Sequence, residues 1–292
     1  MKKGDTLKGH ADIAIIGGSG VYDANMFDNI RQIEVDTPFG KPSDSITLGD
    51  FGEKKVCFLP RHGKGHRVSP TSLNARANIF ALKKLGVKQI IAASAVGSLK
   101  ENIKPLDIVI PDQIYDRTKL RPSTFFDQDI VAHTGFADPF CSGMSNLLHR
   151  IAIENGYNSH PEGTYVCIEG PQFSTRAESN VYRSLGFDII GMTATPEAKL
   201  AREAEICYST IATVTDYDVW HEEDVTMETI IGNVIKNEKA VRTIIRQALE
   251  SLDIEQDCEC RHALDGAIMT DSEMIPYETK YRLKTLIGKY IN

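Results

Sequence analysis

The chain has 292 residues, of which 41% are hydrophobic and 25% are charged, so it is typical of a globular protein with room for one large domain or two smaller ones. Its net charge of −7 argues against a general binder of nucleic acid or of anionic membranes, and any phosphate site must be made by local groups. The sequence contains no apolar run near the ~18 residues that a membrane span needs and no signal-peptide pattern, so we expect a cytoplasmic enzyme.

The first half of the chain predicts several strands and one long helix. Apolar residues at helical spacing predict a helix that begins at Pro70, with Ser69 as its N-cap, and ends at Gly86. The polar and aromatic segment 112–139 predicts an irregular loop with a functional or interface role. Strands are expected at 11–16, 31–36, 45–48, 55–59, 87–94 and 107–110.

The second half continues the alternation of strands and helices, which predicts a mostly parallel or mixed sheet covered on both faces. Strands are expected at 163–168, 187–191 and 208–214. Helices are expected at 141–156, 226–252 and 277–290; a further helix should end near residue 184, and another should begin at residue 195. We therefore expect a flexible N-terminus at 1–10, a main domain at 11–252, and a C-terminal linker and helix at 253–292 that pack on the same domain.

Six cysteines are too few and too scattered for a disulfide-built scaffold, and they form no paired CxxC zinc motif. We therefore expect no metal site. The Cys258-Glu259-Cys260 segment leaves three possibilities open: a labile disulfide, a redox pair, or two simple thiols.

Two aspartates follow the strand expected at 208–214, at the position where ligand sites of α/β sheets usually lie. If water is excluded there, one of Asp216 and Asp218 can stay neutral and donate a proton while the other stays ionised and accepts hydrogen bonds. The alternative is a structural turn in which an aspartate caps the next element, and the spacing alone does not decide between them.

Five other strand ends carry small, hydroxylic or charged residues. The turn 17–20, with Ser19, is either a phosphate loop or a tight strand–helix turn. The cationic segment 60–67, with Arg61 and His62, is either an anion clamp or a solvated loop. The other three strand ends carry Ser94, Phe173 with Ser174, and Thr193. If all of these strand ends converged on one edge of the sheet, they would form a pocket.

Several long motifs occur in a fixed order, namely GGSGVYD, RHGKGH, SAVGSL, EGPQFSTRAE, GMTxxPEAxLAREA and TDYDVW. In these motifs residues 13–249 resemble the purine nucleoside phosphorylase family, and specifically its 5′-methylthioadenosine phosphorylase branch. The resemblance implies an α/β, phosphorylase/hydrolase-like single domain with a mixed, barrel-like central sheet flanked by helices. It also implies a homotrimer, or a hexamer made of two trimers, and an enzyme that needs no metal or organic cofactor.

The implied reaction is the phosphorolysis of 5′-methylthioadenosine to adenine and 5-methylthioribose 1-phosphate, a pentosyl transfer to inorganic phosphate as co-substrate. Its transition state should resemble an oxocarbenium ion. By the resemblance, Asp216 donates a proton to purine N7 and Asp218 accepts from the 6-amino group. The implied phosphate ligands are Ser19, Arg61, His62, Ser94, Ala95 and Thr193.

The resemblance also implies the contacts to the nucleoside. Phe173 would stack on the base, Ser174 would orient Asp216, and Met192 would face the ribose. The pocket for the 5′ group is expected to consist of Met227, Ile230 and Ile231, together with His133 of a neighbouring subunit. The spacing of Met227, Ile230 and Ile231 also suits ordinary core residues.

Two positions depart from the family pattern: Gly191 stands where many relatives have Asn, and Val96 where Cys is common. By analogy with thermophilic members, disulfides Cys141–Cys207 and Cys258–Cys260 are implied. The main alternative function is a broad purine nucleoside phosphorylase that acts on adenosine, inosine or guanosine. A non-catalytic nucleotide sensor would be expected to lose its anion ligands, and an NAD-dependent dehydrogenase would need a GxxG continuation that is absent here.

Overall fold

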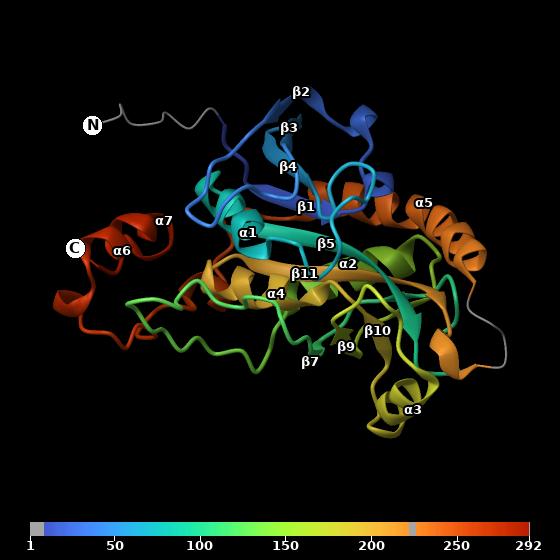
Figure 1. Cartoon of the computed structure of the whole chain (residues 1–292). Coiled ribbons are helices and arrows are strands. Elements are labelled where there is room, and N and C mark those ends of the chain that lie inside the picture. Colours follow the sequence, from blue (N-terminus) through green and yellow to red (C-terminus); the bar gives the residue numbers. More distant parts are fainter. Residues whose placement is uncertain (1–8, 222–225, 292) are drawn as a thin grey trace.

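A mixed sheet of eleven strands forms the centre of the protein in the computed structural model, which describes residues 9–221 and 226–291. The main path of the sheet runs β2-β3-β4-β1-β5-β10-β9-β7 (Figure 1). Off this path, β11 pairs with β5 and β6, and β8 pairs with β6. The strands are β1 (Ile13–Gly17), β2 (Asp28–Ile33), β3 (Ile46–Phe51), β4 (Lys54–Pro60), β5 (Gln89–Ser98), β6 (Ile108–Val109), β7 (Gln113–Arg117), β8 (Ser159–His160), β9 (Thr164–Ile168), β10 (Ile189–Gly191) and β11 (Cys207–Asp216).

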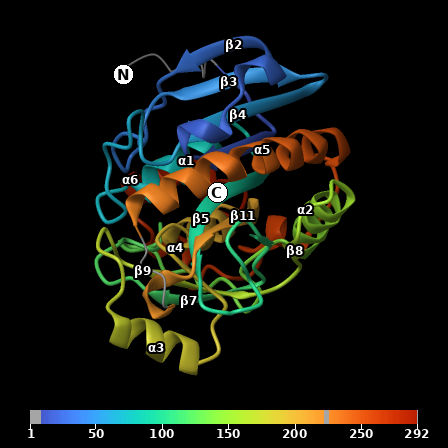
Figure 2. The same ribbon diagram turned by 90° about the vertical axis from the view of Figure 1, so that its right-hand side faces the viewer.

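Helices cover both faces of this sheet, as the alternating pattern predicted. Figure 2 shows the longest helix, α5, lying alongside β5 and β11. The helices are α1 (Ala75–Lys84), α2 (Ser142–Glu154), α3 (Arg176–Ser184), α4 (Ala194–Glu203), α5 (Met227–Ser251), α6 (Tyr277–Arg282) and α7 (Lys284–Ile287). The expected α/β class with a mixed sheet is confirmed, but in the described residues the sheet is open, with β2 and β7 at the ends of its main path. No helix among these residues is both long and apolar enough to cross a membrane.

Strand β1 shows how the sheet separates two hydrophobic cores. Successive side chains of a strand point to opposite faces. Ala14 and Ile16 pack in the core that contains α1 and α4, while Ile13 and Ile15 pack in the core that contains α2 and α5. The strand is buried on both faces, which explains its continuous apolar sequence.

The predicted start of the first long helix was wrong. Helix α1 begins at Ala75, because the side chain of Asn74 accepts a hydrogen bond from the Ala77 amide at 3.1 Å and caps the helix there. Ser69 instead caps a separate turn, in which its hydroxyl accepts from the Ser72 amide at 3.3 Å. Two further expectations need correction: β7 lies within the segment predicted to be irregular, and the final helix is divided into α6 and α7 at Leu283.

The C-terminal segment is packed against the main body of the protein. Leu283, Leu286 and Ile287 are buried in the same core as Ile79 and Phe80 of α1. The division into 1–10, 11–252 and 253–292 stays a prediction, and residues 1–8 lie outside the described part of the chain.

Candidate active site

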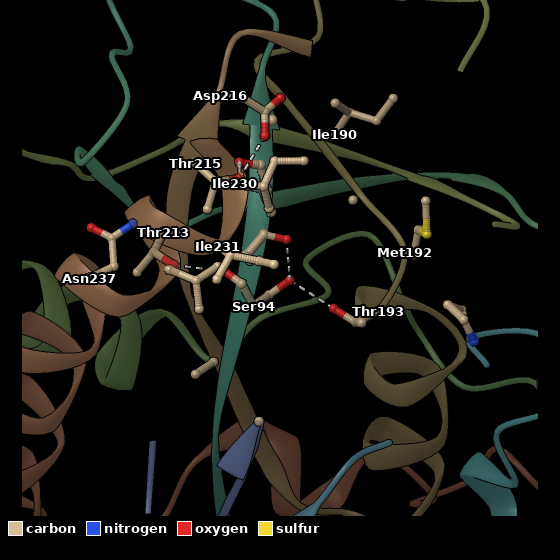
Figure 3. A pocket seen from close by; sticks show the side chains of 18 of the residues that line it. Ser94, Ile190, Met192, Thr193, Thr213, Thr215, Asp216, Ile230, Ile231 and Asn237 are labelled. Carbon is tan, nitrogen blue, oxygen red and sulfur yellow. Dashed lines mark hydrogen bonds between the residues drawn. The ribbon is translucent and has the colours of Figure 1, made fainter. Parts of the chain in front are cut away.

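A cavity of about 620 Å³ opens where several strands end (Figure 3). Its lining brings together most of the residues singled out from the sequence: Arg61, His62, Ser94, Ala95, Phe173, Ser174, Met192, Thr193, Asp216, Asp218, Met227, Ile230 and Ile231. His133 does not line this cavity. The side chain of Ser19 lies outside what the structure describes, although its neighbours Gly18 and Gly20 reach the cavity.

The mixed direction of the strands places two of these groups side by side. Strand β10 runs antiparallel to β5, with Ile190 opposite Gly97. The chain that leaves β10 therefore runs back along β5, and the Thr193 hydroxyl lies 2.8 Å from the Ser94 hydroxyl (Figure 3). Ser94 lies inside β5 rather than at its end. It belongs to the site because the chain that follows β10 brings Thr193 beside it.

Tyr165 of β9 is the third member of this set of hydroxyls, and no local pattern in the sequence pointed to it. Its phenol oxygen lies 3.1 Å from the Ser94 hydroxyl and 3.4 Å from that of Thr193. Tyrosine in a buried strand is normally a core residue, and Tyr165 is fully buried. Only the pairing of β9 with β10 shows that its polar end reaches the site.

Tyr165 also explains the glycine that departs from the family pattern. A Cβ atom at position 191 would lie 2.0 Å from the Tyr165 phenol oxygen. No side chain fits there unless Tyr165 moves. The space that an asparagine side chain would need at this position is therefore taken by the tyrosine hydroxyl.

Arg61 is buried beside the cavity and is held by a buried partner. Its Nε and Nη2 atoms each donate to the carboxylate of Glu197 at 2.8 Å, and its Nη1 donates to the Ala93 carbonyl at 2.8 Å. Burial disfavours the cation, but the charge and hydrogen bonds of Glu197 outweigh this and raise the pKa of Arg61. Because a guanidinium has five N–H groups, the remaining ones can still donate to an anion in the cavity.

His62 is oriented by one backbone group. Its Nδ1 lies 2.9 Å from the Val68 carbonyl, which can only accept, so Nδ1 carries the proton. Burial and then the positive charge of Arg61 lower the pKa of His62 to about 4, so the ring is neutral at pH 7. In that tautomer Nε2 is an acceptor that can bind a protonated oxygen or take up a proton when a dianion arrives.

The two aspartates at the end of β11 have different surroundings. The Asp216 carboxylate accepts from the Thr215 hydroxyl at 2.7 Å and from the Asp218 amide at 2.8 Å. Burial raises the pKa of Asp216, and burial raises that of Asp218 to about 6. Among the described residues Asp218 Oδ2 has no hydrogen-bond partner although it is buried, which is the arrangement expected of a group that awaits a ligand.

Two asparagine side chains of α5 fix the end of β11, although their helical spacing alone does not mark them as site residues. The pairing of β11 with β5 is irregular between Val214 and Asp216. Asn237 Nδ2 donates to the Val214 carbonyl at 3.1 Å and Asn233 Nδ2 donates to the Thr215 carbonyl at 2.7 Å. The Val214 carbonyl also accepts from the Leu106 amide at 2.9 Å, so the two asparagines add to the bonds that hold the irregular strand end carrying Asp216.

Arg121 joins the two loops that follow β9 and β10. Its Nη1 donates to the Met192 carbonyl at 2.6 Å and to the Thr195 carbonyl at 2.7 Å, and its Nη2 donates to the Ile168 carbonyl at 3.1 Å. The sequence placed Arg121 in a functional loop but gave no indication of these partners. Its role is to fix the backbone on either side of Thr193.

One wall of the cavity is apolar. Ile230 and Ile231 at the start of α5 point toward the space above Ser94 (Figure 3), and Val234 continues the same wall. Met227 is 58% exposed, and Phe173 on the opposite loop is 54% exposed. In this single chain, large apolar side chains are thus left open at the cavity mouth.

The disulfides expected by analogy with thermophilic members were wrong. All six are free thiols, so neither Cys141–Cys207 nor Cys258–Cys260 forms a disulfide. These four cysteines instead meet in one cluster whose sulfur atoms all lie within 4.8 Å of one another, a possible metal-ligand set that the scattered spacing did not predict.

Comparison with known proteins agrees with the arrangement of the cavity. A sequence model of the phosphorylase superfamily matches residues 12–250. The S-methyl-5′-thioadenosine phosphorylase of Koribacter versatilis is 52% identical over 282 residues, which are 96% of this chain and 97% of that protein. The crystal structure of a methylthioadenosine phosphorylase from an antarctic soil metagenomic library has a TM-score of 0.91 and 50% identity, covering 96% of this chain and 99% of the other.

A more distant structure includes a ligand. The methylthioadenosine phosphorylase of Schistosoma mansoni in complex with adenine has a TM-score of 0.82 and 37% identity, covering 89% of this chain and 99% of that one. The family resemblance read from the motifs is thereby confirmed.

Proposed function

The chain belongs to the phosphorylase superfamily, and on that premise we propose that it cleaves 5′-methylthioadenosine with inorganic phosphate to give adenine and 5-methylthioribose 1-phosphate. It is then a pentosyltransferase of purine and methionine salvage. The observation that carries the proposal is one cavity with hydroxyls and a guanidinium on one side, two buried carboxyls on another, and an apolar wall between them.

The distance along β5 supports a phosphate at one end of the cavity and a purine at the other. A Cβ at Gly97 would lie 3.0 Å from the Asp216 carboxylate, so Asp216 lies beside Gly97. Ser94 comes three residues earlier, and at about 3.3 Å per residue it lies about 10 Å away along the strand. That separation leaves room for a ribose ring between a phosphate at Ser94 and a purine at Asp216.

The anion side has the donors that a phosphate needs. The hydroxyls of Ser94 and Thr193, the free N–H groups of Arg61 and the ring of His62 surround one part of the cavity, and Ala95 adds a backbone amide. We propose that these groups, with Ser19, hold the nucleophile beneath C1′ and so raise its effective concentration. Because Glu197 neutralises Arg61, uptake of a proton by His62 would help to balance the charge of a dianion.

The base side has one proton donor and one acceptor. We propose that Asp216, protonated, gives its proton to N7 as the bond from C1′ to N9 breaks, and that ionised Asp218 accepts from the 6-amino group. Phe173 would stack on the purine, Ser174 would orient Asp216, and Met192 would lie under the ribose. The wall of Met227, Ile230 and Ile231 suits a methylthio group better than a hydroxyl.

The proposal also covers the oligomeric state of the protein, the compartment in which it works and its need for cofactors. A homotrimer, or a hexamer of two trimers, would cover the exposed Phe173 and Met227 at the cavity mouth and would bring in His133 from a neighbouring subunit. Free thiols throughout suit the reducing cytoplasm. Phosphate is the co-substrate, and the catalytic chemistry proposed here needs no metal or organic cofactor.

The direct test measures release of the free base from 5′-methylthioadenosine with and without phosphate, beside inosine at equal concentration. We expect adenine release that requires phosphate and yields 5-methylthioribose 1-phosphate, with inosine at least tenfold slower. Base release without phosphate would indicate a hydrolase. Equal or faster use of inosine would indicate the broad purine branch instead.

The pKa of Asp218 predicts how the reaction depends on pH. Below about 6 Asp218 is protonated and loses the charge that accepts from the 6-amino group, whereas above that pH it is ionised and competent. We therefore expect kcat/KM for 5′-methylthioadenosine to fall as the pH is lowered through about 6.

The matched variant for this pH profile is Asp218→Asn. It should lower kcat/KM by about 10–100-fold at pH 7.5, the effect of losing a charged hydrogen bond, and remove the limb near pH 6. A variant that keeps the same limb would assign it to another group and contradict this role of Asp218.

A further inference from the structure

Four cysteines from three distant parts of the sequence meet at the end of β11 opposite the end that carries Asp216. Cys141 is the N-cap of α2, Cys207 is the first residue of β11, and Cys258 and Cys260 lie at the 3₁₀ turn Glu259–His262. Their sulfur atoms all lie within 4.8 Å of one another. Cys207 and Cys260 are buried, and Cys141 is 9% exposed.

The distances suit a single metal ion better than two disulfides. Four sulfurs at about 2.3 Å from a tetrahedral Zn²⁺ lie about 3.8 Å from one another. Cys258 Sγ lies 3.8 Å from Cys141 Sγ and 3.1 Å from Cys207 Sγ, so one sulfur approaches two partners at once. Disulfides would instead separate the four into bonded pairs at about 2.05 Å.

The surroundings can stabilise the negative charge that such a site would carry. Cys141 stands at the N-terminus of a 13-residue helix, where the backbone dipole favours an anion. The Cys260 amide donates to Cys258 Sγ at 3.4 Å, a contact of the kind that orients a thiolate ligand. Cys141, Cys207 and Cys260 belong to the hydrophobic core formed with α2 and α5, and the partly buried Cys258 packs against that core.

We propose that Cys141, Cys207, Cys258 and Cys260 bind one Zn²⁺ as a closed, structural tetrathiolate site. Binding displaces the thiol protons, so that Zn²⁺ and four Cys–SH give [Zn(S–Cys)₄]²⁻ and four H⁺, with no change of oxidation state. Four protein ligands leave no open position for a substrate. The site lies at the first residue of β11, whereas Asp216 is the last, about 30 Å away at about 3.3 Å per residue.

The function of the ion would be to fasten the C-terminal segment to the main body. Cys258 and Cys260 come from the segment that follows α5, while Cys141 and Cys207 belong to a helix and a strand of the sheet layer. A metal bond between them closes a loop of long sequence separation, which stabilises the folded state. We expect removal of the ion to lower stability while leaving the geometry of the cavity unchanged.

The test uses the full chain, expressed with added Zn²⁺ and purified under reducing, oxygen-free conditions. Elemental analysis should give about one Zn²⁺ per chain, and replacement by Co²⁺ should give the absorption bands of tetrahedral cobalt–thiolate coordination. The variant Cys258→Ser should lose the metal, and Cys57→Ala, which removes a buried thiol outside the cluster, should keep it. Chelation should lower Tm in wild type but not in Cys258→Ser.

Several results would overturn the proposal. These are less than about 0.1 metal ion per chain with all thiols free, disulfides among the four cysteines in the non-reduced alkylated protein, or metal retained by Cys258→Ser. If that variant fails to fold, the Co²⁺ spectrum of wild type decides alone, because cobalt bound without thiolate bands would exclude the cluster as its ligands.

Discussion

Replacing Asp216 by Asn should lower kcat for 5′-methylthioadenosine by about 10²–10⁴-fold, the usual contribution of a positioned general acid. The side chain is held by the Thr215 hydroxyl and the Asp218 amide, and burial raises its pKa, which is the direction that a proton donor requires. An amide of the same size keeps a donor for N7 but cannot release a proton to it. The measurement is steady-state kinetics of adenine release at saturating phosphate.

The same variant should favour inosine relative to 5′-methylthioadenosine. A neutral amide has two N–H donors, so it can serve N7 and the 6-oxygen of inosine together. A matched control is Asp50→Asn on β3, a carboxylate outside the cavity, which should leave both rates unchanged. If Asp216→Asn cleaves 5′-methylthioadenosine within threefold of wild type, Asp216 is not the acid.

Much of the site could be predicted from the sequence because its residues follow strands directly. A strand end is a local pattern of apolar residues followed by small or polar ones; Arg61 and Thr193 follow a strand, and Asp216 is the last residue of one. Since ligand sites lie at such ends, the positions could be selected before their arrangement was known. The position of these residues relative to the predicted strands was enough to select them, and no contact between distant parts of the chain had to be inferred.

Tyr165 and Glu197 could not be found by the same reasoning. Tyr165 has the sequence context of a core residue, and it reaches Ser94 only because β9 pairs with β10 and β10 lies antiparallel to β5. Glu197 lies in the first turn of α4 and meets Arg61 136 residues away in sequence. Strand direction and helix docking decide these contacts, and neither is encoded in a local motif.

The cysteines show the limit of spacing rules most clearly. The usual zinc motif has two ligands separated by two to four residues, and no two of these cysteines have that spacing, since Cys258 and Cys260 are separated by one residue. Cys141 and Cys207 join them because α2 begins beside the first residue of β11, where the Cys141 amide donates to the Tyr208 carbonyl at 2.8 Å. That docking is set by the packing of α2 and α5 on the sheet.

Replacing Arg61 by Met should have the largest effect on stability. The Glu197 carboxylate is 2% exposed, and the change removes the cation that pairs with it. Among the described residues, the Tyr208 hydroxyl at 2.8 Å is then its remaining side-chain donor. Breaking a buried ion pair in this way costs about 3–5 kcal/mol. Urea unfolding at pH 7.5 should show this loss, and the KM for phosphate should rise about 10–100-fold because a charged donor is gone.

The double variant Arg61→Met/Glu197→Gln separates the two roles of the arginine. With the buried charge removed, most of the lost free energy of unfolding should return, because both members of the ion pair are now neutral. The KM for phosphate should stay high, since glutamine at position 197 supplies no cation to the cavity. If the double variant recovers normal phosphate binding, Arg61 acts only through the fold. If the single variant changes neither stability nor phosphate KM, the buried pair with Glu197 has neither role.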